Sequence, residues 1–269
     1  MRSTVQGVKE GLSPAVSPVG QLYAFFMDTL VGFGRAIARR RFEVRDTVDQ
    51  TWFLASVTTL PAVLVMIPLG VVVSVGIGGP TTQLGAQAYG GAITAFVVIG
   101  QAAPMVCALM IAGVGGSAMT ADLGARKIRE ETDALEVMGI STIERLVVPR
   151  VAAAILVTLL LDALVMAVGI LVSFAFQVFV FDVTAGAFLE TMTRFARTED
   201  FGVSLVKAGA FALLSAIVAC HKGLTAKGGP GGVGQAVNEA VVVSFILVFV
   251  ANVGISQLYQ LFIPAQGTY

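Results

Sequence analysis

Five long, predominantly apolar stretches constrain the fold of this chain more than any other feature of its sequence. About 20 such residues suffice for a helix to cross the hydrocarbon core of a bilayer. The composition agrees, because 56% of the residues are hydrophobic and only 13% are charged, whereas a soluble domain has about 25% charged residues. Continuous apolar runs also argue against a β-barrel, whose strands alternate apolar and polar positions. We therefore predict an all-α polytopic membrane protein with five transmembrane helices, near residues 52–78, 92–119, 146–179, 201–220 and 240–262.

Residues 1–45 are predicted to form a cytoplasmic N-terminus and an interfacial amphipathic helix. Apolar residues recur at three- and four-residue spacing from Val19 to Ile37, and the three consecutive arginines Arg39 to Arg41 follow them. This pattern is typical of a helix that lies in the membrane interface with its basic residues toward anionic headgroups. An amphipathic helix packed on a soluble core is the alternative.

The segment after the second apolar stretch is densely charged, since eight of the fifteen residues from Asp122 to Glu136 carry a charge. Each ion would cost several kcal/mol within hydrocarbon. We therefore predict a helix at about residues 120–139 that lies outside the bilayer and is attached to a membrane span at each end. A soluble partner can contact such a helix. The alternative is a solvated loop helix in which Lys127 and Glu131 form an i to i+4 ion pair.

The basic residues predict the orientation of the chain. An N-terminus inside the cell puts 14 of the 17 lysines and arginines on the cytoplasmic side, as the positive-inside rule requires. Only Arg194 and Arg197 then face outward, and Lys207 lies near the outer end of a span. The prediction is a multi-pass protein of the cytoplasmic (inner) membrane, with a cytoplasmic N-terminus and an external C-terminus.

Sequence motifs for chemistry are absent from the chain. It contains no GxxxxGK[ST], GxSxG or HExxH, and Cys107 and Cys220 lie far from CxxC spacing. The net charge of zero gives no sign of a nucleic-acid interface. We expect no enzyme activity, no metal site and no cofactor in this chain, so any energy that it uses must come from a separate subunit or an ion gradient. The glycine-rich GGPGGVG is expected to form a turn before the last span.

Prolines and two ionisable residues interrupt the apolar spans. Pro61, Pro68 and Pro104 are expected to kink or break their helices, because proline removes a backbone hydrogen bond. Asp162 and Lys207 are costly in hydrocarbon. We expect these two residues either to form a structural ion pair between the third and fourth spans or to have a functional role.

Four segments of the sequence resemble one family. They are GGSAMTADLGARKIREETDALEVMGI, the preceding GQAAPMV, the fourth-span pattern from KAGAF to ACHKG, and the closing GGPGGVGQAVNEAVVVS. Together they resemble the MlaE/YrbE permeases, the membrane subunits of ABC-type lipid transporters that work with MCE-domain proteins. The resemblance runs from about Asp46 to Leu261, and it is most similar to the A-type permeases of actinobacterial Mce systems.

The resemblance implies a five-span permease domain over residues 46–269 after the interfacial helix. It also implies a homologous permease that pairs with this chain around a lipid pocket, MCE-domain proteins that form a lipid tunnel on the outer side, and two copies of an ABC ATPase that carries the ATP and Mg. The charged helix would be the coupling helix, which docks in a groove of the ATPase. The residues expected to couple are Arg126, Arg129, Glu130, Asp133 and Glu136 on its polar faces, with Leu123 and Ile128 for packing.

Gln101 departs from the MlaE branch of the family, which has a short charged motif at this point. A neutral amide neither repels an anionic lipid nor pairs with a cationic one. We therefore expect a pocket for a single-headed lipid such as a fatty acid, with Gln101 at the headgroup and Val73, Ile77 and Leu84 along the tail. The alternative is a hydrogen bond from Gln101 to a neighbouring helix.

These observations predict an ATP-driven permease that imports lipid. Two other functions stay open. One is a non-transporting scaffold that anchors the MCE-domain proteins. The other is an ion-coupled secondary carrier, which would need inverted repeats and intramembrane ion ligands.

Overall fold

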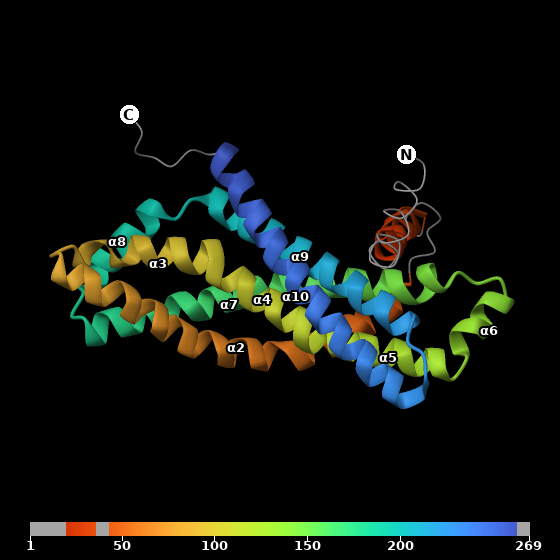
Figure 1. Cartoon of the computed structure of the whole chain (residues 1–269). Helices are drawn as coiled ribbons and strands as arrows, with labels where there is room; N and C mark the ends of the chain where they lie inside the picture. The colour runs from red at the N-terminus through yellow and green to blue at the C-terminus, as the bar shows by residue number, and fades with distance from the viewer. Residues whose placement is uncertain (1–19, 36–42, 263–269) are drawn as a thin grey trace, which may run out of the picture.

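The computed structural model describes residues 20–35 and 43–262, and these residues form helices and connecting turns without a β-strand. Five helical segments are long and apolar enough to cross a membrane, and they form one elongated bundle (Figure 1). The predicted all-α polytopic membrane fold is therefore confirmed. Each span begins before its predicted first residue, because the helices continue beyond the apolar residues. The spans cover Val44–Gln83, Gln87–Ile128, Ile143–Val180, Thr198–Leu224 and Gly229–Tyr259.

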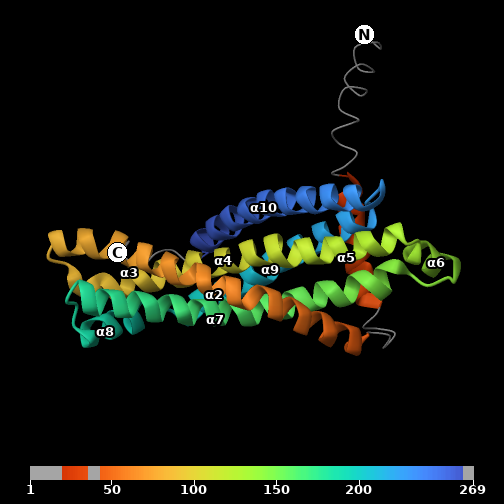
Figure 2. The same cartoon turned by 90° about the horizontal axis from the view of Figure 1, so that it is seen from below.

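The first and third spans lie side by side along much of the bundle (Figure 2). They are α2 (Val44–Gln83) and α7 (Val148–Val180). Gly70 of α2 allows close approach, and its carbonyl oxygen accepts a hydrogen bond from Oγ of Ser173 at 3.3 Å. A small residue and a shared hydrogen bond are typical of helix contacts within a membrane.

The second span contains irregular turns. It consists of η1 (Gln87–Tyr89), α3 (Gly90–Val97), the π-helical η2 (Val98–Ala102), α4 (Ala103–Met110), the π-helical η3 (Ile111–Gly115) and α5 (Gly116–Ile128). Pro104 lies at the start of α4, directly after η2, so an irregular turn occurs where a proline was expected to disturb the helix. In contrast, α2 continues through Pro61 and Pro68 without a break. The loss of single backbone hydrogen bonds is tolerated there, as in other membrane helices.

The last part of the bundle consists of α8 (Ala185–Phe195), α9 (Thr198–Leu224) and α10 (Gly229–Phe262). The short α8 packs against α3 at one tip of the bundle (Figure 1). The glycine-rich segment differs from the expected turn, because α10 already begins at Gly229. Pro230 suits this position, since the first turn of a helix needs no N–H from it.

Residues 20–35 form a helix that lies across the bundle rather than along it (Figures 1 and 2). Leu22 and Phe26 pack on the hydrophobic core, and the ring centroid of Phe25 lies 5.2 Å from that of His221. The predicted helix is therefore present, in a transverse position that suits a membrane interface. The arginines at positions 39–41 lie outside the described residues.

The charged segment forms the tip of the bundle opposite α8 (Figure 1). We call this tip the α6 end and the opposite tip the α8 end. α5 continues to Ile128, a separate helix α6 covers Glu131–Val137, and the π-helical η4 (Ile143–Val147) starts the third span. Glu130 has a left-handed φ of 59°, which the interior of an α-helix does not accommodate. The prediction of one continuous helix at 120–139 is therefore wrong.

The interior holds two large hydrophobic clusters, one toward each tip. The cluster toward the α6 end includes Leu54, Leu123 and Val147, and the one toward the α8 end includes Met66 and Val98. Both cysteines are free and buried in these clusters, as their apolar sequence context suggested.

Gly91 is a point of close contact between α3 and α8, because a Cβ there would lie 2.1 Å from the backbone oxygen of Phe188. We predict that Gly91→Ala lowers the melting temperature in detergent, at a cost of about 1–3 kcal/mol. Gly76→Ala in α2, where nothing lies within 4 Å, is the matched control. It should leave the melting temperature unchanged or raise it. Equal effects of the two substitutions would contradict the packing of α3 on α8.

Candidate functional site

The α6 end presents an exposed surface of mixed charge. The side chains of Arg129 and Asp133 are 61% and 53% exposed, and Glu130 and Glu136 are exposed beside them. Figure 2 shows α6 projecting beyond the ends of the other helices. Four of the predicted coupling residues therefore lie where a partner can reach them. Arg126 is half-buried at the base of this surface.

Ion pairs hold α6 against the end of α5. Nζ of Lys127 binds Oδ1 of Asp133, and this hydrogen bond lowers the pKa of the Asp133 carboxyl. Nε of Arg129 lies 2.7 Å from Oε1 of Glu131. The pair between Lys127 and Glu131, which belonged to the alternative interpretation as a solvated loop helix, is not among the ion pairs of the described residues, because the left-handed turn at Glu130 interrupts the helical spacing that would bring them together.

The two apolar residues predicted to pack in the coupling helix have different positions. Leu123 is fully buried in the core of the bundle, so the prediction that it packs against a partner is wrong. Ile128 is 37% exposed and remains accessible. Val137 is 89% exposed at the end of α6, and it was not among the residues predicted to couple. The available signal was an apolar residue at the end of a short helix rich in charged residues.

An ion pair joins α5 to α7 at the base of the α6 end. Arg150 of α7 is only 4% exposed, and its Nη1 donates to the carbonyl oxygen of Leu146 at 2.7 Å. Its Nη2 donates to Oδ2 of Asp122 on α5, and Oδ1 of Asp122 accepts from Nε of Arg126 at 3.3 Å. A carboxylate partner offsets the cost of burying the guanidinium. Sequence reasoning missed this pair, because nothing in the spacing of residues 28 positions apart predicts contact.

Two further contacts connect the α6 end to other spans. Nη1 of Arg145 in η4 pairs with Oε1 of Glu43, and its Nη2 lies 3.5 Å from Oδ2 of Asp46 on α2. Oγ1 of Thr120 on α5 donates to the carbonyl oxygen of Ala219 on α9 at 3.1 Å. The base of the charged segment is therefore bonded to three neighbouring helices.

Gln101 lies in the π-helical turn η2 and binds α10. Its Nε2 donates to Oγ of Ser256 at 3.3 Å, and its Oε1 accepts from Nδ2 of Asn252 at 3.3 Å. This geometry matches the alternative interpretation, in which Gln101 bonds to a neighbouring helix. Contact between Gln101 and a lipid stays a prediction.

The two ionisable residues within the spans have separate partners. Nζ of Lys207 donates to the carbonyl oxygen of Gly100 at 2.8 Å. In a regular helix that carbonyl would accept from residue 104, but Pro104 has no N–H, and Lys207 supplies a donor instead. Asp162 is fully buried and accepts from Oγ of Ser204 at 2.8 Å. The expected ion pair between Asp162 and Lys207 is not among the contacts of the described residues.

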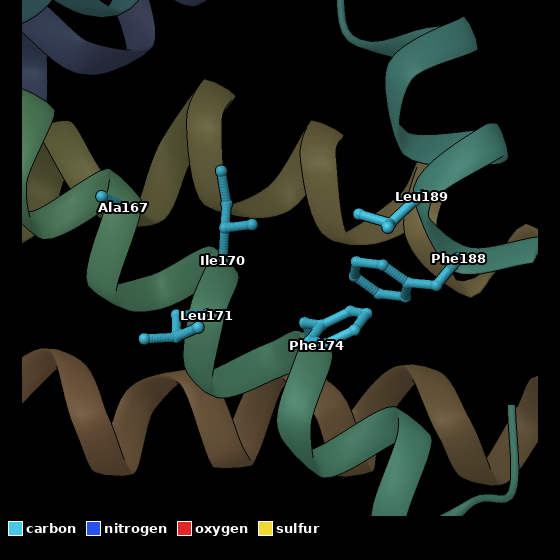
Figure 3. A pocket seen from close by; sticks show the side chains of 6 residues that line it. All are labelled: Ala167, Ile170, Leu171, Phe174, Phe188 and Leu189. Carbon is cyan, nitrogen blue, oxygen red and sulfur yellow. The ribbon is translucent and has the colours of Figure 1, made fainter. Parts of the chain in front are cut away.

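Figure 3 shows an apolar groove between α7 and α8. Its volume is about 420 Å³, and it is lined by Ala167, Ile170, Leu171, Phe174, Phe188 and Leu189. A second apolar groove of about 270 Å³ runs between α7 and α9 and shares Ala167 and Ile170 with the first. Acyl chains are the kind of apolar group that these grooves can hold.

The predicted lipid-binding residues line neither of these grooves. Ile77 is nearly buried and Leu84 is 80% exposed, while Val73 packs beside the hydrophobic cluster toward the α8 end. Within a single chain these residues and Gln101 do not share one of the grooves. Their role in binding lipid stays a prediction.

Five helices long and apolar enough to cross a membrane, a transverse helix and an exposed charged tip are the architecture of a multi-pass membrane protein. The sequence matches the family described as Permease MlaE over residues 47–258. The chain therefore belongs to the MlaE permease family.

Several proteins of known name are similar to this chain. A probable ABC transporter permease of Synechocystis is 29% identical over 222 residues, which cover 82% of this chain and 84% of that protein. The chloroplastic protein TRIGALACTOSYLDIACYLGLYCEROL 1 of Arabidopsis thaliana is 29% identical over 178 residues, 66% of this chain and 51% of the relative. A probable ABC transporter permease of Rickettsia felis is 32% identical over 156 residues, 58% of this chain and 60% of the relative. The chain is thus a permease of the MlaE family, and its named relatives include probable ABC transporter permeases.

The hydrogen bond from Ser204 to Asp162 gives a direct test of the polar interior. We predict that Ser204→Ala lowers stability in detergent by about 1–3 kcal/mol, because a buried carboxyl then loses its donor. Ser56→Ala is the matched control, since Ser56 is exposed and bonds only to the carbonyl of Phe53 in its own helix. Thermal unfolding of both variants measures the difference. An unchanged melting temperature for Ser204→Ala would show that this bond does not support the fold.

Proposed function

We propose that this chain is the permease subunit of an ATP-driven lipid transporter and that the ATPase binds the α6 end. The observation that carries the proposal is the exposed α6, with its mixed charges and the apolar Val137, at the tip of a bundle that belongs to an ABC permease family. A short helix of this kind suits a groove on a soluble partner. Movement of the ATPase would then act on α5 and α7, which flank α6 in the chain.

We place the α6 end in the cytoplasm, because basic residues gather there and the positive-inside rule favours that side. The N-terminus is then cytoplasmic and the C-terminus external, in the cytoplasmic (inner) membrane. The basic residues in question, all in the described part of the chain, are Arg126, Lys127, Arg129, Arg145, Arg150 and Lys222.

We further propose that a homologous permease packs along α10. This span is the least buried of the five, and it exposes Val242, Ile246 and Phe249. A second permease would cover this face and enclose a lipid between the two chains. MCE-domain proteins would bind at the α8 end, on the outer side, and two ATPase copies with ATP and Mg at the α6 end.

The lipid is proposed to be a fatty acid or a related single-headed lipid that is imported. Gln101 would meet the headgroup, and Val73, Ile77 and Leu84 would contact the tail in the paired assembly. The name of the Arabidopsis relative includes a glycolipid, which supports a lipid rather than a polar solute. The side chain of Gln101 is neutral, so its amide can form hydrogen bonds with a headgroup without forming an ion pair with it.

Copurification distinguishes the two other functions from this one. The full chain is coexpressed with the homologous permease and the ATPase, and the complex is purified and placed in vesicles with a fluorescent fatty acid. An ATP-driven permease requires a stoichiometric ATPase and ATP-dependent movement of the fatty acid. An ion-coupled carrier would purify without an ATPase. A scaffold would bind the ATPase, yet substitutions at Gln101 and Val73 would leave transport unchanged.

Val137 offers a sharp test of the ATPase contact. We predict that Val137→Asp lowers the affinity for the ATPase by about tenfold or more, because a charge replaces an apolar group at the centre of the contact. The fold should be unaffected, since Val137 is 89% exposed. Binding of purified ATPase to the detergent-solubilised chain measures the effect.

The matched control for this variant is Val180→Asp, because Val180 is 54% exposed at the α8 end. It should bind the ATPase as the unaltered chain does. Full affinity of Val137→Asp, or an equal loss in both variants, would contradict docking at the α6 end.

A further inference from the structure

We propose that Asp122 and Arg150 are positioning residues that pass the movement of α6 to the membrane spans. The inference rests on the proposed function, because it assumes that an ATPase moves α6. It assigns to these two residues a role in coupling ATP hydrolysis to lipid transport, although neither lies on the surface offered to the ATPase.

The position of the pair in the chain is the first support. Asp122 lies on α5 before α6, and Arg150 lies on α7 after α6, 28 positions further along the chain. The pair therefore joins the two helices that lead into and out of the α6 end. A bond between α5 and α7 at this level opposes sliding of one helix past the other, so the two helices respond together to a force on α6.

Continuous contacts from α6 to α7 are the second support. Oε2 of Glu131, the first residue of α6, lies 3.9 Å from Nη1 of Arg126. Nε of Arg126 donates to Asp122 at 3.3 Å, and Asp122 accepts from Nη2 of Arg150. Charged contacts thus lead step by step from the exposed helix to a buried guanidinium in a membrane span.

The burial of Arg150 determines which contact in this series matters most. Arg126 and Glu131 are more than a third exposed, and pairs of that kind are weak because water and salt screen them. In the pair of Asp122 and Arg150, Asp122 is 40% exposed but Arg150 is only 4% exposed, and the Arg150 side chain is also fixed by the carbonyl of Leu146. The bond between Asp122 and Arg150 is therefore the firm connection, and the outer contacts orient α6 on it.

α7 can carry the movement deep into the bundle. It packs along α2 for much of its length, and Arg145, at the start of the same span, pairs with Glu43 and Asp46 at the beginning of α2. A shift of α7 at Arg150 therefore shifts α2 as well. The first and third spans would respond to α6 as one unit.

The test is the number of lipid molecules moved for each ATP hydrolysed. The complex of the full chain with its ATPase is reconstituted in phosphatidylglycerol and phosphatidylethanolamine vesicles that contain a fluorescent fatty acid. We expect Asp122→Asn, which keeps the size but removes the charge, to assemble and hydrolyse ATP while this ratio falls about fivefold or more. Asp122→Glu restores the charge and should recover most of the ratio.

Two further variants complete the design. Glu239→Gln removes another ion pair, that of Glu239 with Lys222, which joins α9 to α10, and it should leave the ratio unchanged. Arg150→Lys keeps the charge but replaces the guanidinium, whose two Nη atoms bind the Leu146 carbonyl and Asp122 separately, with a single ammonium, so the ratio should fall as in Asp122→Asn. If Asp122→Asn does not assemble, Arg150→Lys decides the question.

The outcomes separate this inference from the function on which it rests. A normal ratio in an assembled Asp122→Asn complex, or a parallel loss of hydrolysis and transport, would overturn the coupling role and leave only a structural one. Absence of ATP-dependent transport in the unaltered complex would overturn the proposed function itself, and the coupling role with it.

Discussion

The cost of placing charge in hydrocarbon is the constraint on which the structure of this permease depends. It divides the chain into five apolar spans and a charged segment that collects at one tip, where α6 lies beyond the other helices. The same cost explains why Arg150, at the border of the two regions, is buried only with Asp122 as a partner. Without that carboxylate the buried guanidinium would be left with the carbonyl of Leu146 as its partner, and a poorly paired charge is costly away from water.

Within the bundle, the same constraint acts on backbone groups as well as on side chains. Pro104 removes an N–H from the second span, and Lys207 supplies a donor to the carbonyl of Gly100. Gln101, one residue further, binds α10 through Asn252 and Ser256. One irregular turn in the second span is therefore bonded to both the fourth and the fifth spans. A shift of any of these helices must change hydrogen bonds at this turn.

Length and hydrophobicity are enough to predict the spans, because about 20 apolar residues have few alternatives to crossing a membrane. The transverse helix follows from its three- and four-residue spacing in the same way. The break at Glu130 is different, because its left-handed backbone is an exception that no residue pattern signals. The partners of Asp162 and Lys207 also escaped prediction, since each is bonded to a group brought near by helix packing. Val137 is exposed whereas Leu123 is buried, and the sequence alone does not reveal this difference.

Site-specific photocrosslinking at Met138 tests the central claim most directly, because this residue is 64% exposed beside Val137 at the α6 end. A photoreactive amino acid at this position, in the complete complex in membranes, should attach to a subunit whose peptides contain a Walker A motif. The same probe at Leu189, on α8 at the opposite end, should not attach to that subunit. Attachment of the ATPase from Leu189, or none from Met138 in an active complex, would contradict the account.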